Sequence, residues 1–89
     1  MTTQNKAPAI TGQPKTLHLK ELPAENTLAF LQGKVAGYIE TIRTIDGRTM
    51  IVNENGAYLS LPVNDESSEL AGFKIVGDTV VLDFGLDLP

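Results

Sequence analysis

The sequence predicts an α+β domain in which a small antiparallel β-meander, residues 37–61, packs two short helices on one of its faces. Two dipeptides, Asp46-Gly47 and Asn55-Gly56, predict the meander, because each lies between runs rich in strand-forming residues. Such dipeptides favour the tight turn of a hairpin. Helical spacing and capping residues at 26–35 and 64–71 predict the helices.

Length and periodicity describe a single small domain. The chain has 89 residues and a mass of 9.6 kDa, which is enough for one hydrophobic core. Residues 1–15 are polar, contain Pro8 and Pro14 and show no helix or strand period, so we predict a flexible arm. We assign residues 16–84 to the α+β domain and expect residues 85–89 to form a loose tail.

The elements before the meander follow from local patterns. Leucines that alternate with polar residues predict a half-buried strand within residues 16–22. In the helix that follows, Asn26 or Thr27 is the expected cap, and Gly37 ends the run.

The elements after the meander are predicted in the same way. Asn64 is the expected cap of the second helix, and Gly72 suits its C-terminal end. The β-branched residues near 78–84 predict a strand that closes the sheet.

The two turns also predict a register and two faces for the meander. With two-residue loops, Ile42 lies opposite Ile51, and Glu40 lies opposite Asn53. The core side then carries Ile39, Ile45, Met50, Val52, Leu59 and Leu61. The open face carries the candidate binding residues Tyr38, Glu40, Asn53 and Tyr58. Tyrosine is enriched at interfaces, but an ordinary solvated sheet face is the alternative.

A second group of residues is expected to serve the architecture. We predict positive φ at Gly56, because a Cβ is costly in that turn conformation, and an N-terminal helix cap at Asn64. The members of this group are Gly37, Gly47, Gly56, Pro62 and Asn64.

Composition narrows the chemistry that the chain can perform. Without cysteine it has no disulfide, thiolate metal site or thiol nucleophile, and its one histidine, His18, is expected on a polar strand face. Nucleophile elbows, phosphate-binding glycine loops and calcium-loop spacing are absent from the sequence. We therefore predict no catalytic residues, no metal, no cofactor and no enzymatic activity.

Charge is distributed unevenly along the chain. Residues 1–20 hold three lysines and no acid, whereas residues 21–89 hold four basic and eleven acidic residues, a net charge of −7. An acidic domain repels phosphates, so direct nucleic-acid binding is disfavoured, and a DNA mimic is an alternative use of this charge. No apolar run is long enough for a membrane span and no signal-peptide pattern is present, which makes the cytoplasm the expected location.

The chain also resembles a family built on a domain of unknown function that is common in small phage and plasmid proteins. That family shows a short helix, a V-G-G-Y-I-E segment, an N-E-x-G turn, an L-P-x-N segment and a final strand around I-x-G. Ala36 stands where the first family glycine is expected. The matching residues are Leu28, Leu31, Gln32, Val35, Gly37, Tyr38, Ile39, Glu40, Asn53, Glu54, Asn55, Gly56, Leu61, Pro62, Val63, Asn64, Ile75, Val76, Gly77 and Asp78. The resemblance implies a small α+β fold and a mobile-element origin, without an activity.

These observations lead to three functional hypotheses. The first is a non-enzymatic binding protein of a phage or mobile element that engages a host protein of defence or regulation. The second is an oligomeric binder of a small molecule, which sequesters a nucleotide-like signal. The third is the acidic DNA mimic. A homodimer is also expected, because a small β-rich domain leaves a sheet edge to cover.

Overall fold

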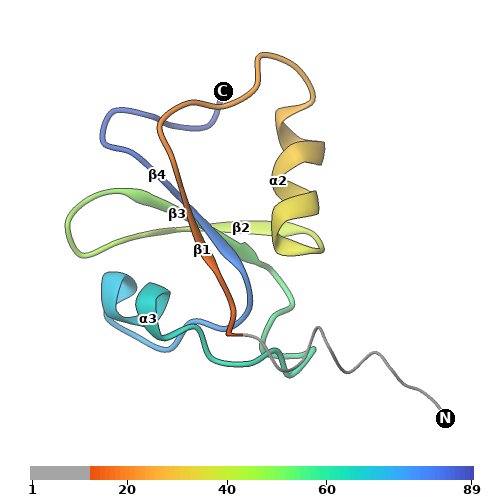
Figure 1. Cartoon of the computed structure of the whole chain (residues 1–89), viewed down its shortest axis with the longest axis vertical. Coiled ribbons are helices and arrows are strands. Elements are labelled where there is room, and N and C mark those ends of the chain that lie inside the picture. The colour runs from red at the N-terminus through yellow and green to blue at the C-terminus, as the bar shows by residue number, and fades with distance from the viewer. Residues whose placement is uncertain (1–12) are drawn as a thin grey trace, which may run out of the picture.

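The computed structural model describes residues 13–89, which form one four-stranded sheet and two helices (Figure 1). The α+β class is therefore confirmed. The elements are β1 (Thr16–Leu19), α2 (Thr27–Val35), β2 (Ile39–Arg43), β3 (Thr49–Asn53), α3 (Asp65–Ala71) and β4 (Thr79–Leu82). Most of the predicted arm, residues 1–12, lies outside the described residues. Within residues 13–89 no helix is long and apolar enough to cross a membrane.

The sheet is mixed, with strand order β1-β4-β3-β2, and is not a simple meander. β1 runs parallel to β4, while β2–β3 and β3–β4 are antiparallel pairs. β4 therefore sits in the interior of the sheet, and its four residues are all buried. Its composition, Thr-Val-Val-Leu, suits a strand covered on both faces.

The first predicted hairpin forms, but its register differs from the prediction by one residue. Thr44 N–H donates to the Arg48 carbonyl, which leaves three residues in the loop. Gly47 closes that loop at φ 94°, typical of a turn followed by a bulge. Ile42 consequently lies opposite Met50, not Ile51, and Glu40 lies opposite Val52.

The second predicted hairpin is wrong. Residues 54–60 form consecutive turns, and the neighbour of β3 on this side is β4. Gly56 does not have the expected positive φ, whereas Ser60 does, at 57°. β4 is the better partner because it offers side chains that can be buried on both faces of the sheet.

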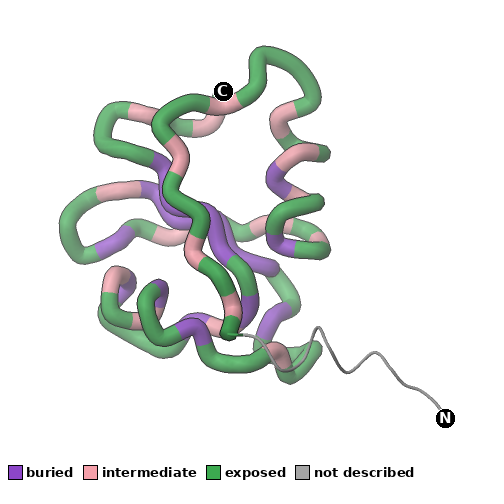
Figure 2. Tube along the Cα trace, viewed as in Figure 1, coloured by how far each residue is buried: buried purple, intermediate pink, exposed green. Residues whose placement is uncertain are grey.

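The two helices lie on opposite faces of the sheet, which corrects the prediction that they share one. On the α2 face, Leu31 and Val35 pack against a buried set from the central strands: Ile51, Val80 and Leu82. On the α3 face, Ala71 and Ile75 pack with Met50, Val52 and Val81. The buried stretches of Figure 2 accordingly follow the central strands. Ile51 shares the predicted open face, because it is two residues from Asn53 in one strand, but it is fully buried. Ile45 and Leu59, predicted in the core, are exposed.

The start of α2 and the C-terminal end of the chain also differ from expectation. Asn26 precedes α2 in a left-handed conformation and its side chain makes no capping bond, while the Thr27 hydroxyl donates to the Pro23 carbonyl instead. The tail at residues 85–89 is not loose, because Leu86 and Leu88 pack against the core on the α2 face. By contrast, Asn64 and Gly72 bound α3 as predicted.

Candidate functional site

The four candidate binding residues do not share one face. Tyr38 and Tyr58 are 68% and 89% exposed, and Glu40 is exposed on β2. Tyr58 lies in the turns after β3, not on a strand. Asn53 is only 5% exposed. It lies opposite Ile39, whose side chain packs on the α2 face, so Asn53 and Glu40 are on opposite faces.

Asn53 is a structural residue of the loop and of α2. Its Nδ2 donates to the Val35 carbonyl at 3.0 Å and to the Ala36 carbonyl at 3.4 Å, which satisfies backbone acceptors at the end of α2. Its Oδ1 accepts from Asn55 N at 2.7 Å. The side chain is thus occupied on both sides and buried, and it is not available to a ligand.

The exposed residues instead lie at the start of β2 and in the loop after β3. Glu54 N–H donates to the Tyr38 carbonyl at 2.8 Å, which joins the two segments. We call this region the tyrosine surface; it comprises Tyr38, Glu40, Glu54, Tyr58 and Leu59, all of them exposed.

Backbone hydrogen bonds fix the loop that carries Tyr58. Leu59 N donates to the Asn55 carbonyl at 2.8 Å, Ser60 N to Ala57 O at 3.1 Å, and Leu61 N to Gly56 O at 3.2 Å. Ser60 has a left-handed conformation, which is uncommon for a residue with a side chain and costs energy. The loop therefore presents its two exposed apolar side chains from a defined backbone.

The architectural group has roles that can be stated atom by atom. A Cβ at Gly37 would lie 2.7 Å from Asn53 Nδ2, and one at Gly56 would lie 2.9 Å from Val76 Cγ2. Glycine is therefore favoured at both positions, because a neighbouring side chain approaches the backbone too closely for a Cβ. The Pro62 carbonyl accepts from Gly77 N at 2.8 Å.

A group of polar side chains, buried except for the half-buried Thr16, joins α3 to β1 and β4. We call it the polar cluster; it comprises Thr16, Asn64, Ser67 and Thr79. Ser67 Oγ lies 2.6 Å from Thr79 Oγ1 and 2.7 Å from Thr16 Oγ1. Thr16 Oγ1 also donates to Asn64 Oδ1 at 3.1 Å. The hydroxyls thus satisfy one another in a region where unpaired polar groups would be costly.

Asn64 does more than cap the helix. Its Oδ1 accepts from Ser67 N at 3.0 Å, while its Nδ2 donates to the Gly77 and Lys15 carbonyls at 3.0 and 3.3 Å. Sequence reasoning found only the cap. The available signal was the spacing of Ser67 and Ala71, which places two small residues on one helical face and so permits close approach to the sheet.

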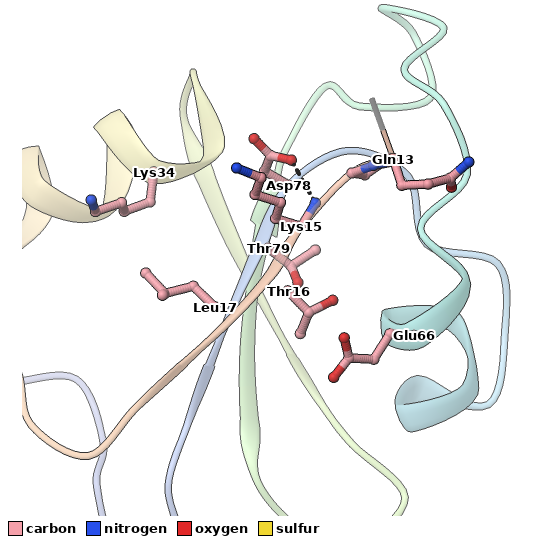
Figure 3. A pocket seen from close by; sticks show the side chains of 9 residues that line it. Gln13, Lys15, Thr16, Leu17, Lys34, Glu66, Asp78 and Thr79 are labelled. Carbon is pink, nitrogen blue, oxygen red and sulfur yellow. Dashed lines mark hydrogen bonds between the residues drawn. The ribbon is translucent and has the colours of Figure 1, made fainter. Parts of the chain in front are cut away.

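A hollow of about 680 Å³ lies beside β1 (Figure 3). Leu17 and Lys34 lie on one side of the strand in this view, and Thr16 and Glu66 lie on the other. Just beyond, His18 Nε2 is 2.8 Å from Glu66 Oε2, a contact between residues far apart in the sequence.

The tip of the β2–β3 hairpin holds the one strongly shifted carboxyl among the described residues. Hydrogen bonds from Arg48 and from the Thr44 hydroxyl lower the pKa of Asp46 from 3.8 to about 2. Arg48 Nη2 lies 2.8 Å from Asp46 Oδ2, and its guanidinium stacks 5.2 Å from the centre of the Phe84 ring. The Asp46 carboxylate and the Arg48 guanidinium thus bind each other, and their contact stabilises the turn.

Within residues 13–89 no group of three or more His, Cys, Asp or Glu side chains is placed to hold a metal ion. Neither curated proteins nor solved structures give a match to the chain. A family model does match, and it covers residues 7–86, nearly the whole sequence. The chain therefore belongs to the family described as a domain of unknown function, DUF3846.

Proposed function

We propose that this chain is a small, non-enzymatic binding protein of a mobile element, which engages a host protein through the tyrosine surface. The observation that carries the proposal is the exposure of Tyr58 and Leu59 on a loop with a fixed backbone. A rigid loop loses little conformational freedom on binding, so more of the contact energy becomes affinity. The phage or plasmid origin rests on the sequence resemblance.

The chemistry of this surface suits a protein partner. Two tyrosines supply large amphipathic contact areas with few rotatable bonds, and tyrosine is enriched at binding hot spots. Glu40 and Glu54 add negative charge beside them. We expect a partner with an apolar depression bordered by lysine or arginine side chains.

The small-molecule alternative lacks one of the four side chains that it needs. A pocket of Tyr38, Glu40, Asn53 and Tyr58 would need the Asn53 amide on the open face, but that amide is buried and occupied. The tyrosine surface therefore supports a macromolecular partner better than a nucleotide-like ligand. The DNA mimic stays an alternative that depends on total charge only.

Site-specific cross-linking in bacterial cells tests the proposal. A photoreactive phenylalanine analogue would replace Tyr58, and in a matched control it would replace Leu28, which is exposed on α2. We expect a defined adduct with one host protein from position 58 and none from position 28. The adduct should disappear when Tyr38→Ala is added.

Equal adducts from both positions, or no adduct from position 58, would overturn the proposal. Mass spectrometry of the purified native protein separates the alternatives. A co-purified small molecule would favour ligand sequestration, and a DNA-binding protein in the adduct would favour the DNA mimic.

A further inference from the structure

We propose that a second copy of this chain pairs antiparallel with β1, so that two four-stranded sheets join into one. β1 is the terminal strand of the sheet. Thr79 N donates to the Lys15 carbonyl, and Asp83 N donates to the Leu19 carbonyl. In a parallel ladder alternate residues turn toward the same neighbour, so the backbone groups of Thr16 and His18 point away from β4.

This edge lacks the prolines, bulges and charged side chains that commonly protect an edge strand from pairing. Within residues 13–89 no strand lies on the outer side of β1, and the hollow borders residues 13–17. β1 contains no proline, no glycine bulge and no Lys, Arg, Asp or Glu. Leu17 at its centre is 37% exposed. Such an edge is a template for another strand.

The opposite edge is better protected. β2 carries two charged residues, Glu40 and Arg43, among its five residues. Arg43 Nη1 donates to the Gly47 carbonyl at 3.0 Å, which holds this side chain at the end of the strand. Charged side chains on an edge strand are a common barrier to pairing, so β1 is the favoured edge.

The β1 edge is self-complementary in register. With a two-fold axis at Leu17, Thr16 of each copy lies opposite His18 of the other, and these are the residues whose backbone groups point outward. Each such pair can exchange two N–H···O=C bonds. The two Leu17 side chains then meet on the α2 face, where their exposed area is covered.

Charge also permits two copies to meet here. The charged side chains that line the hollow are Lys15, Lys34, Glu66 and Asp78, two of each sign. Outside the hollow, residues 21–89 are strongly acidic, with nine acidic and three basic residues. A balanced patch avoids the like-charge repulsion that would oppose association of other faces. The tyrosine surface lies elsewhere, so this inference is independent of the proposed function.

Sedimentation of three variants tests the edge directly. His18→Pro removes an outward N–H without breaking a bond to β4, and His18→Ala keeps that N–H while it removes the imidazole. Thr41→Pro is the matched variant for β2. The backbone N–H of Thr41 points away from β3, because the residues on either side of it make the hydrogen bonds to that strand. We expect the wild type to show a species of twice 9.6 kDa at high concentration.

His18→Pro should raise the dimer dissociation constant by about tenfold or more, because hydrogen bonds across the interface are lost. His18→Ala and Thr41→Pro should leave it nearly unchanged. A wild type that stays monomeric overturns the proposal. So does a dimer that Thr41→Pro dissociates and His18→Pro does not.

Amide hydrogen exchange of the wild type gives a second answer that needs no variant. The Thr16 and His18 amides should be protected at high concentration and should exchange faster on dilution, while Leu17 and Leu19 stay protected by β4. Protection of the Thr16 and His18 amides that is unchanged by dilution would mean that a segment of the same chain pairs with this edge. Fast exchange of these amides at all concentrations would mean that no strand pairs with it. Either result contradicts the proposal.

Discussion

The polar cluster and the tyrosine surface are both rich in polar groups, but they differ in what those groups contact. In the polar cluster Asn64, Ser67 and Thr79 are buried, Thr16 is half-buried, and all four side chains are hydrogen-bonded to another part of the fold. On the tyrosine surface, Tyr38 and Tyr58 are exposed and contribute little buried area. The difference teaches that polarity alone does not mark a functional residue, since burial with satisfied bonds indicates a role in folding.

The largest expected effect comes from breaking the polar cluster. Asn64→Ala removes the helix cap and the side-chain donor to the Gly77 carbonyl, and it leaves the Thr16 hydroxyl with Ser67 as its remaining partner. We expect the free energy of unfolding to fall by about 3 kcal/mol in urea denaturation. Asn64→Asp keeps the accepting oxygen but loses the Nδ2 donor. For this variant we expect the free energy of unfolding to fall by roughly half as much as for Asn64→Ala. Equal losses for the two variants would mean that the Nδ2 donor carries the whole contribution and that the cap adds nothing.

The next effect tests close approach beneath the loop that carries Tyr58. Gly56→Val places side-chain atoms against Val76 and should lower the free energy of unfolding by about 2 kcal/mol. Gly33→Ala is the control, because nothing lies within 4 Å of its Cβ position and alanine favours a helix. It should raise the stability by about 0.5 kcal/mol or more. A neutral Gly56→Val would show that the loop can move away from Val76.

These comparisons rest on features that the sequence predicts unequally. The cap at Asn64, the helix end at Gly72 and the turn at Asp46-Gly47 were predictable, because each is a local signal. The register was not, because Asp-Gly fits both two-residue and three-residue loops. The shift by one residue separated Asn53 from Glu40, and α2 covers the face of β3 on which Asn53 lies.

Long-range pairing was the other part that local patterns could not supply. The Asn55-Gly56 dipeptide suggested a hairpin, yet the partner of β3 comes from residues 79–82, which bury both faces. The polar cluster and the contact of His18 with Glu66 likewise join residues from opposite ends of the sequence. Tyr38 and Tyr58 are exposed as predicted, but the prediction for Tyr58 depended on the second hairpin, and the residue lies in a turn instead.

A smaller effect depends on pH and lies at the hairpin tip, away from both regions. Because the folded pKa of Asp46 is depressed from 3.8 to about 2, its contribution to stability is present above the unfolded pKa. The contribution is lost as the pH falls from about 4 toward 2. Asp46→Asn should therefore flatten the acid limb of a stability curve in this range. An unchanged acid limb would show that the contact with Arg48 adds no net stability.

The smallest expected effects are those of the tyrosine surface. Tyr58→Ala and Tyr38→Ala each remove an exposed side chain, and we expect losses of about 0.5 kcal/mol or less in the free energy of unfolding. Thermal melts followed by circular dichroism measure this. A loss above about 2 kcal/mol for Tyr38→Ala would place its ring among the groups that hold the fold.

The most direct test of the account is equilibrium unfolding of Tyr58→Ala and Asn64→Ala side by side in one buffer. If the polar cluster serves the fold and the tyrosine surface is free to bind, Asn64→Ala should lose at least about 2 kcal/mol more than Tyr58→Ala. Losses of equal size, or a larger loss for Tyr58→Ala, would contradict this division and remove the basis for a binding surface at Tyr58.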